Sequence, residues 1–364
     1  MTKKDLIKFL KVDKAMQRQL KIESSTISDD SDCFVIAEIG NNHQGDMQKA
    51  MEMFKAAKEC GVDAVKLQKR DNKSLLTRAA YNKPYDNENS FGATYGEHRE
   101  ALEFGKKEYI ELKKYADEIG LTMFATAFDM KSADFLAELD MPLYKIASGD
   151  LKNTPLLKHV AKIGKPMIIS TGGGTMEDVQ RAYDAIMPIN KQLAILQCTA
   201  SYPAEPQDLN LRVITTYREK FPDVVVGLSD HENGIAMALA AYVLGSRMVE
   251  QHFTLNHTWK GTDHAFSLEP IGMRKLVRDL RRVKVAMGDG EKRIYPSEVN
   301  PIHKMGKKLV AARDLKAGQV LTREDIAIKS PSDGIPPYEL DNVIGKTLTK
   351  DLLEDENLAF ENLK

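Results

Sequence analysis

The chain has 364 residues, of which 42% are hydrophobic and 29% are charged, and its formal net charge is −1. This length suffices for a large core, and the near-neutral charge gives no global field that would favour nucleic acid or an anionic membrane. The longest apolar run, residues 235–244, is about half as long as a bilayer span.

Cysteine usage bears on the cellular compartment. Cys33, Cys60 and Cys198 are widely spaced and form no CxxC pair. The N-terminus has no continuous apolar segment of the kind a secretory signal needs. We therefore expect a reduced, cytoplasmic protein without a disulfide framework and without a membrane or nucleic-acid partner.

Eight short apolar runs of strand type alternate with segments of helical periodicity. The runs are residues 34–39, 64–67, 123–125, 143–146, 167–169, 193–196, 224–228 and 248–249. Eight strand–helix repeats in about 250 residues are typical of a TIM, or (β/α)8, barrel. A doubly wound open sheet is the structural alternative. One connection, residues 69–105, is unusually long, polar and turn-rich, and such segments usually contribute to function or assembly.

Segments on both sides of this barrel domain, residues 33–288, have a different pattern. Residues 1–32 form an extension in which "KIESSTISDDSD" predicts a hairpin that covers the N-terminal end of the barrel. Residues 289–305 begin with glycine and charged residues, and we expect them to form a linker. Residues 306–364 are expected to form a second, small domain.

The small domain contains an internal repeat. "RDLKAGQVLTREDI", from Arg313, aligns without gaps with "KDLLEDENLAFENL", from Lys350. Two similar halves indicate a compact pseudo-symmetric module. Its core is small, so docking on another surface would stabilise it.

The C-terminal ends of TIM-barrel strands carry the functional side chains. Polar residues lie near the end of each of the eight runs or shortly after it: Glu38, Lys66, Gln68, Thr126, Lys145, Ser148, Asp150, Ser170, Thr171, Tyr202, Ser229, Asp230, His231, Glu250 and His252. Two lysines, several hydroxyls and the Gly172-Gly173-Gly174 turn predict a site for an anion with phosphate and carboxylate groups. The alternatives to an anion site are that the lysines are solvated surface charges and that the glycine turn binds no ligand. A lysine that points into the barrel, however, needs an anionic partner.

His231 and His252 end two strands that are neighbours in a closed barrel, so their imidazoles can converge on one cation. Two histidines leave most coordination positions open, which suits a labile, catalytic Mn²⁺, Mg²⁺ or Co²⁺ better than a structural zinc ion. The alternative is that each histidine is hydrogen-bonded within a polar barrel mouth. Glu38 could orient water or transfer a proton, or form a salt bridge with Lys66. Asp263, in "TWKGTDHAFSLEP", could bind a sugar hydroxyl or only cap a helix.

The segments that carry these residues resemble the sialic acid synthase family, which includes the N-acetylneuraminate, legionaminate and pseudaminate synthases. The resemblance spans residues 34–364 and rests on eight ordered motifs: "FVIAEIGNNHQGD", "VKLQK", "YKIASGD", "ISTGG", "QCTASYP", "GLSDH", "EQHFT" and "KGTDHAFSLEP". The repeat-containing tail is similar to the antifreeze-like (SAF, β-clip) domain of that family.

The resemblance implies a metal-dependent transferase of sialic acid biosynthesis that forms a carbon–carbon bond. It would condense phosphoenolpyruvate with an open-chain N-acyl hexosamine, N-acetylmannosamine or its 6-phosphate, to a nonulosonic acid and phosphate. The resemblance implies that His231 and His252 bind the metal, for which Mn²⁺ is the first candidate. It also implies that Glu38 and Asp150 are catalytic residues, as are the two histidines. The residues implied to bind substrates are Lys66, Thr126, Lys145, Ser148 and Ser170 for phosphoenolpyruvate, and Gln68, Tyr202 and Asp263 for the acceptor.

The family is typically a domain-swapped homodimer whose antifreeze-like domain covers the partner's barrel mouth. Bacterial members often carry Lys-Arg-Pro in the tail, where the arginine reaches the N-acyl group, but this chain has Ser330 at the arginine position. Bacterial members also often have Glu where Asp150 stands. The segments "TYGEHREALEF" and "TWKGTDH" resemble animal-type enzymes, which use the 6-phosphate. The phosphorylation state of the acceptor stays open.

Three other functions also stay open. One is a different phosphoenolpyruvate–aldose condensation, including legionaminate or pseudaminate synthesis. Another is an aldolase that forms a Schiff base on Lys145. A non-enzymatic saccharide-binding or ice-binding protein is suggested only by the tail, and it would leave the inward lysines and paired histidines without a reason.

Overall fold

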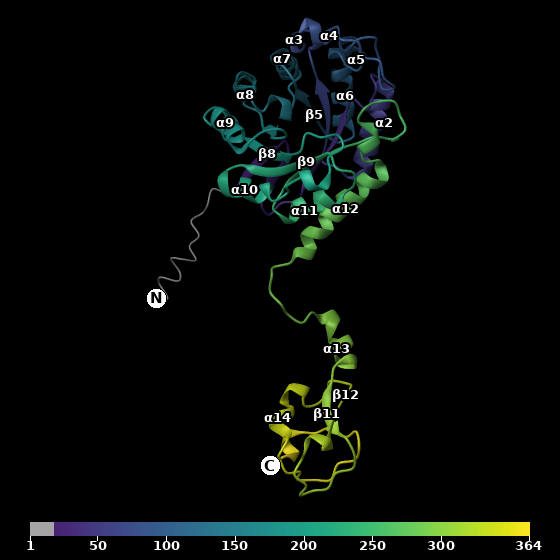
Figure 1. Ribbon diagram of the computed structural model, residues 1–364, viewed down its shortest axis with the longest axis vertical. Coiled ribbons are helices and arrows are strands. Elements are labelled where there is room, and N and C mark those ends of the chain that lie inside the picture. The colour runs from purple at the N-terminus through teal and green to yellow at the C-terminus, as the bar shows by residue number, and fades with distance from the viewer. Residues whose placement is uncertain (1–17) are drawn as a thin grey trace. The chain divides into compact units, whose positions relative to one another are not determined.

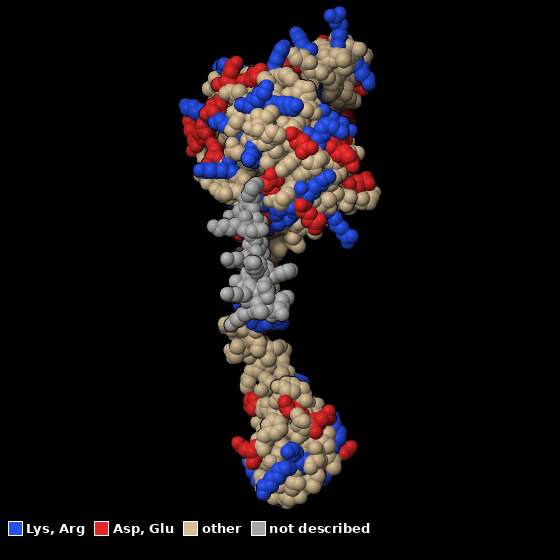
Figure 2. All heavy atoms as spheres, turned by 90° about the vertical axis from the view of Figure 1, so that its left-hand side faces the viewer, with Lys and Arg blue, Asp and Glu red and all other residues tan. Residues whose placement is uncertain are grey.

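The structure is a computed structural model that describes residues 18–364, so residues 1–17 of the expected extension lie outside the described part. The chain divides into two units, of which one ends at Met287 and the other comprises Gly288–Lys364. Within residues 18–364, no helix combines the length and the apolar character that a membrane span requires. On the face of the larger unit that Figure 2 displays, basic and acidic side chains are interspersed.

The larger unit is a TIM barrel, as predicted. Its eight parallel strands close in the order β10-β3-β4-β5-β6-β7-β8-β9 (Figure 1). Pairing of β10 with β3, from Met248 opposite Phe34 to His252 opposite Glu38, closes the barrel and excludes the open-sheet alternative. The strands are β3 Phe34–Gly40, β4 Ala64–Lys69, β5 Thr122–Ala127, β6 Tyr144–Ile146, β7 Met167–Ser170, β8 Leu193–Cys198, β9 Val225–Asp230 and β10 Met248–His252.

Most strands extend beyond their predicted ends. β4 pairs with β5 through Lys69 and Ala127, and β10 continues to His252, although the apolar runs stop earlier. The backbone of these polar residues still completes the hydrogen-bonded ladder while their side chains reach the barrel mouth. The candidate residues Gln68, Thr126 and His252 therefore lie on strands and not on loops.

Helices surround the barrel because each carries one apolar stripe that packs on the strands. In the helix after β3, Ala50, Met53, Phe54 and Ala57 follow the helical spacing and are all buried. The helices are α2 Met47–Cys60, α6 Lys106–Glu118, α7 Met130–Glu138, α8 Thr154–Ala161, α9 Met176–Ile186, α10 Val213–Lys220, α11 Ala236–Val243 and α12 Pro270–Met287 (Figure 1).

The connection between β4 and α6 is more ordered than the predicted turn-rich loop. Residues 70–105, hereafter the insert, contain three short helices, α3 Asn72–Leu75, α4 Arg78–Tyr81 and α5 Tyr95–Ala101. The ring of Tyr85 lies 5.4 Å from that of Tyr95 and 4.6 Å from that of His98, which gives the insert a small aromatic core of its own.

A hairpin, β1 Gln19–Ile22 and β2 Ser25–Ser28, lies against the N-terminal end of the barrel. Its side chains Leu20, Ile22 and Ile27 are at most 2% exposed and share one buried cluster with residues near the starts of the strands, such as Phe34 and Ala64. The hairpin therefore closes the end of the barrel opposite to the mouth at which the polar residues gather.

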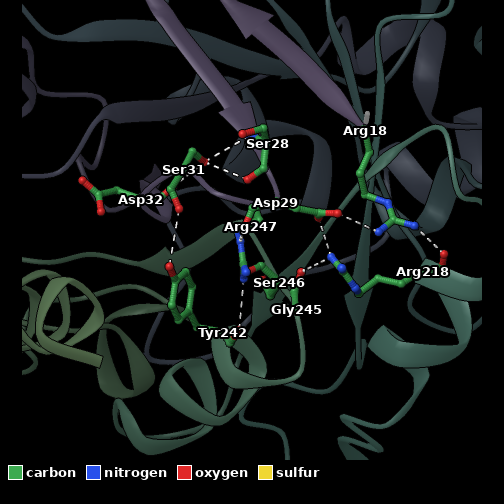
Figure 3. Close-up of polar contacts among 10 residues, drawn as sticks. All are labelled: Arg18, Ser28, Asp29, Ser31, Asp32, Arg218, Tyr242, Gly245, Ser246 and Arg247. Atoms are coloured by element: carbon green, nitrogen blue, oxygen red, sulfur yellow. Dashed lines mark hydrogen bonds and ion pairs between the residues drawn. The ribbon is translucent and has the colours of Figure 1, made fainter. Parts of the chain in front are cut away.

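Asp29 fastens the exit of this hairpin to distant parts of the barrel (Figure 3). Its carboxylate accepts hydrogen bonds from Arg18 at 3.0 Å and Arg218 at 2.7 Å, and its carbonyl oxygen accepts one from Arg247 at 2.7 Å. Burial acts to raise the pKa of Asp29, but Arg218, Arg18 and Arg247 hold it below its usual value. The charged carboxylate thus joins segments far apart in the sequence.

The smaller unit contains α13 Val299–Met305, the antiparallel strands β11 Lys308–Ala311 and β12 Ile326–Lys329, and α14 Leu340–Val343. The two halves of its repeat contact each other at matching positions. The backbones of Leu315 and Leu352 exchange hydrogen bonds of 2.8 and 3.0 Å. Asp314 accepts from the N–H of Glu354 at 2.9 Å, and Asp351 accepts from that of Ala317 at 2.8 Å. These reciprocal contacts agree with the predicted pseudo-symmetry.

The packing of the hairpin generates a prediction about stability. Replacing Ile22, which is 1% exposed, by alanine leaves a cavity at the closed end of the barrel. We expect Ile22→Ala to lower the free energy of unfolding of the barrel by about 2–5 kcal/mol in urea denaturation. Ile110→Ala, at a position that is 52% exposed on α6, is the matched control. Equal effects of the two substitutions would show that the hairpin does not stabilise the barrel.

Candidate active site

A cavity of about 510 Å³ opens at the C-terminal ends of the barrel strands. All the residues to which the resemblance assigns a role, except Asp150, line it, whereas Thr171 and Asp230 of the strand-end set do not. The barrel topology brings together side chains from segments spread over more than 200 positions. The predicted residues in its lining are Glu38, Lys66, Gln68, Thr126, Lys145, Ser148, Ser170, Tyr202, His231, His252 and Asp263.

Two predicted features lie outside this lining. Asp150 belongs to a short 3₁₀ turn, Ser148–Asp150, and its carboxylate accepts a hydrogen bond from Asn153 at 3.0 Å. Burial raises the pKa of Asp150, and Asp150 is not among the residues that line the cavity, although its neighbours Ser148 and Gly149 are. Its catalytic role stays a prediction. The turn at Gly172 was expected to bind the anion directly, yet the Gly172 N–H donates to Ser148 Oγ at 3.0 Å. The turn instead positions the Ser148 hydroxyl.

The floor of the cavity consists of two lysines and two glutamates, Lys66, Lys145, Glu38 and Glu250. Lys66 Nζ lies 2.7 Å from Glu38 and 3.6 Å from Glu250, and Lys145 Nζ lies 3.4 Å from Glu250. Both lysine side chains are 3% exposed, which excludes solvated surface charges. Glu38 forms the salt bridge with Lys66 that the sequence offered as the alternative to a role with water or a proton. The two positive and two negative charges of the floor balance.

Burial and neighbouring charges shift the four groups of the floor differently. Burial alone would lower the pKa of Lys66, but Glu250 and Glu38 outweigh it and raise that pKa. Burial lowers the pKa of Lys145 despite the nearby Glu250. Burial acts to raise the pKa of Glu250, but Lys145 and Lys66 bring it to about 2. Burial raises the pKa of Glu38. Lys66 and Glu250 therefore stay charged, whereas Lys145 and Glu38 are the groups nearest to proton exchange.

Hydroxyl groups complete the floor. Lys66 Nζ donates to Thr126 Oγ1 at 2.9 Å, and Ser229 Oγ donates to Glu250 at 3.1 Å. Ser170 Oγ is buried and has no hydrogen-bond partner in the described chain. A buried hydroxyl without a partner calls for an explanation, and a ligand in the cavity would supply one.

His231 and His252 lie side by side in the cavity wall, with ring centroids 5.3 Å apart. His231 Nδ1 donates to the carbonyl oxygen of Thr199 at 2.8 Å, which leaves Nε2 as the nitrogen available to a cation. His252 Nδ1 is buried without a hydrogen-bond partner, and burial lowers the pKa of His252 to about 3, so this ring is neutral. The structure therefore does not have two fully hydrogen-bonded histidines, which was the alternative to a metal site.

These two rings fit a divalent cation that takes its other ligands from water and substrate. Neutral imidazole is the histidine form that binds metal, and His252 is already in this form. Burial acts to lower the pKa of His231, but its contacts with Cys198 and Thr199 raise that pKa, so this ring has to give up its Nε2 proton when a cation binds. Residues 18–364 contain no group of three or more His, Cys, Asp or Glu side chains suited to a metal. A site with only two protein ligands suits a labile ion rather than a structural one. The ring of Tyr202 lies 4.1 Å from that of His231 at an interplanar angle of 39°, and Asp263 lies 3.8 Å from His252.

The sequence placed Glu250 at a strand end but assigned it no role, and it did not single out Arg70 and Arg99. The need of inward lysines for anionic partners was the signal that could have assigned Glu250. Arg70 follows directly after "VKLQK", and Arg99 lies in the long connection expected to serve function. Gln68 joins the two regions, because it donates to Glu38 at 2.7 Å and accepts from Arg70 at 2.6 Å.

Comparisons with known proteins identify the family of the chain. The model of the NeuB family matches residues 53–292, and that of the SAF domain matches residues 308–364. The N-acetylneuraminate-9-phosphate synthase of Homo sapiens is 42% identical over 330 residues, covering 90% of this chain and 92% of the human protein. The N,N'-diacetyllegionaminic acid synthase of Legionella pneumophila is 35% identical, with 91% of this chain and 95% of that protein covered.

Solved structures of related enzymes have the same fold. The N-acetylneuraminic acid synthetase of Leptospira borgpetersenii, solved with citrate, superposes with a TM-score of 0.69 at 29% identity, covering 79% of this chain and 96% of that one. A 3-deoxy-D-arabino-heptulosonate 7-phosphate synthase of Thermotoga maritima, with a TM-score of 0.58 at 16% identity, shares the fold alone. The chain therefore belongs to the sialic acid synthase (NeuB) family of enzymes and combines the TIM barrel with a C-terminal SAF domain.

Proposed function

We propose that this enzyme condenses phosphoenolpyruvate with an open-chain N-acyl hexosamine, N-acetylmannosamine or its 6-phosphate, to give a nonulosonic acid and inorganic phosphate. The observation that carries the proposal is the convergence, in one cavity, of a lysine and hydroxyl floor with two metal-competent histidines. Relatives named as N-acetylneuraminate-9-phosphate and N,N'-diacetyllegionaminic acid synthases support this class of product.

Phosphoenolpyruvate would bind on the floor. Its phosphate and carboxylate oxygens are acceptors for the ammonium groups of Lys66 and Lys145 and for the hydroxyl of Ser170, which has no partner of its own. Thr126 and Ser148 extend this set of donors. The Leptospira synthetase was solved in complex with citrate, a carboxylate anion, and this supports an anion site in such a barrel.

A divalent cation, Mn²⁺ first and Mg²⁺ or Co²⁺ as alternatives, would be held by His231 and His252. When bound, it supplies a Lewis acid that polarises the aldehyde oxygen of the acceptor. Tyr202 and Asp263, which flank the two histidines, would contact the acceptor, together with Gln68 at the boundary with the floor.

The π electrons of the C2=C3 bond of phosphoenolpyruvate would form the new bond to the aldehyde carbon, while the aldehyde π bond breaks and its oxygen takes a proton to become a hydroxyl. Water would then add at the electron-poor C2, and the C2–O bond would break to release phosphate and leave a ketone at C2. Glu38 would accept the proton of that water, because its buried carboxylate has a raised pKa and is oriented by Gln68 and Lys66. Asp150 receives no role in this scheme, since it does not line the cavity.

The other functions considered from the sequence fit less well. The lowered pKa of Lys145 would suit a Schiff-base aldolase, but its ammonium group is paired with Glu250 at 3.4 Å and the relatives are synthases. Membership in an enzyme family argues against a purely saccharide-binding or ice-binding protein. A cytoplasmic location and a domain-swapped homodimer also remain proposals, supported by three unpaired cysteines and by the small core of the SAF domain.

A direct assay tests this function. Purified full-length enzyme, given phosphoenolpyruvate, Mn²⁺ and either N-acetylmannosamine or its 6-phosphate, is expected to release phosphate in a one-to-one ratio with a thiobarbituric-acid-positive product. A diacetamido hexose serves as a third acceptor. Absence of turnover with every N-acyl hexosamine would contradict the proposal.

Metal removal tests the role of the two histidines. A chelator is expected to abolish activity and added Mn²⁺ to restore it in the wild-type enzyme. The double variant His231→Ala with His252→Ala should lose activity about 100-fold or more and gain nothing from added metal, because a Lewis acid contributes several kcal/mol to such a transition state. His159→Ala, at a partly exposed position on α8, is the control and should behave like wild type. Full activity of the chelated enzyme would remove the proposed metal.

A further inference from the structure

Arg70, the first residue of the insert, lines the cavity and has no part in the proposed reaction. Its side chain is 9% exposed, and the carbon of its guanidinium group lies 3.8 Å from the centre of the Phe128 ring. Nη1 lies 3.8 Å from Glu103, and Nη2 donates a hydrogen bond of 2.6 Å to Oε1 of Gln68. These contacts fix the direction of the guanidinium group, because its planar fork cannot turn without breaking them.

The contact with Arg70 determines which way the Gln68 amide points. Gln68 Oε1 accepts from Arg70, and Gln68 Nε2 donates to Oε1 of Glu38 at 2.7 Å. If the amide turned over, its NH2 group would face the guanidinium, which only donates, and its oxygen would face a charged carboxylate, which only accepts. Arg70 thereby disfavours one of the two amide orientations, and the N–H groups of Gln68 point at Glu38.

The backbone of β3 leaves room for the contact between Gln68 and Glu38. The ladder between β3 and β4 is irregular between Glu38 and Gly40, and Gly40 has a φ of +53°. A Cβ atom on Gly40 would lie 3.2 Å from Gln68 Nε2 and 3.2 Å from Glu38 Oε1. A larger residue at this position would therefore press on both atoms of the hydrogen bond, and glycine also tolerates the positive φ.

This series of contacts ends at the group that is proposed to move a proton. Lys66 lies 2.7 Å from Oε2 of Glu38, so Oε1 is the oxygen that Gln68 holds. A general base must lie within hydrogen-bond reach of the water that it deprotonates, and a small displacement slows the reaction strongly. The polar side-chain contacts of Arg70 run to Gln68 and Glu103, so its influence on Glu38 passes through Gln68.

We propose that Arg70 is a positioning residue of this enzyme: through the Gln68 amide, it holds the Glu38 carboxylate where that group can take the proton of the water that adds at C2. The inference rests on the proposed function, in which Glu38 has this role. It extends the machinery of the site to a residue outside the barrel strands, because Arg70 belongs to the insert. No bond to Arg70 forms or breaks in the reaction.

A double-mutant cycle on the full-length enzyme tests the inference. Arg70→Met keeps an apolar stem and removes the guanidinium group, whereas Gln68→Met fills the space between Arg70 and Glu38 without an amide. The turnover number kcat and the KM for each substrate are measured with Mn²⁺, phosphoenolpyruvate and the N-acyl hexosamine that the wild-type enzyme uses best. Arg78→Met is the matched control, because Arg78 is an exposed arginine of the same insert that does not line the cavity.

We expect Arg70→Met to lower kcat about 10- to 100-fold, because a misplaced base loses much of the factor that general base catalysis contributes. The KM for phosphoenolpyruvate should change less than about twofold, since Arg70 is not among the donors proposed for that substrate. In the Gln68→Met background, Arg70→Met should change kcat less than about twofold, because no amide then links Arg70 to Glu38. Arg78→Met should behave like wild type.

Other outcomes overturn the inference. Equal losses in the two backgrounds would mean that Arg70 acts without Gln68. A raised KM for phosphoenolpyruvate, or a change confined to the KM for the sugar, would mean that Arg70 contacts that substrate directly. Circular dichroism checks that each variant is folded. If Arg70→Met does not fold, Arg70→Gln, which keeps a polar group in the cavity, takes its place in the cycle with the same expected result.

A structural measurement separates this inference from the proposed function. If the wild-type enzyme has no turnover, the proposed function fails, and crystal structures of the variants decide the inference alone. In the folded Arg70 variant, the Gln68 side chain is expected to leave its contact with Glu38, whereas Arg78→Met should keep that contact at about 2.7 Å. A contact between Gln68 and Glu38 that persists without the arginine would refute the inference.

Discussion

The ion pairs that join Lys66 and Lys145 to Glu38 and Glu250 are the constraint on which the site depends. A lysine inside a barrel mouth is tolerated only with an anionic partner, and removing one member leaves a buried charge unpaired. The closed barrel meets this need by bringing β10 beside β3, so that Glu250 and Glu38 come from adjacent strands. The floor is thereby neutral before a substrate arrives, and an anionic substrate can draw on both ammonium groups.

The other functional groups are arranged around this floor according to the elements that carry them. Strand ends supply His231 and His252, which line the cavity, and the hairpin at the opposite end of the barrel packs on residues near the strand starts. The insert contributes Arg70 and Arg99 from outside the barrel. A chain with a net charge of −1 can therefore concentrate positive charge at one mouth.

The sequence was sufficient for the barrel and for most of the site, because eight buried apolar runs define the strands and polar residues at their ends must meet. The rule does not by itself decide Asp150, since β6 ends at Ile146 and the chain then turns through a 3₁₀ helix of which Ser148 and Gly149, but not Asp150, line the cavity. Arg99 was not identified because its position depends on the aromatic packing of Tyr85 and His98 within the insert, which no strand or helix periodicity reveals.

Binding of phosphoenolpyruvate to the floor is the central claim, and calorimetric titration tests it most directly. We predict saturable binding to the wild-type enzyme and binding about 10- to 100-fold weaker to Lys145→Met, since one charged donor is lost. Lys158→Met, at an exposed lysine on α8, should bind like wild type, and circular dichroism should show all three proteins folded. Unchanged affinity in folded Lys145→Met, or no saturable binding to the wild-type enzyme, would contradict the account.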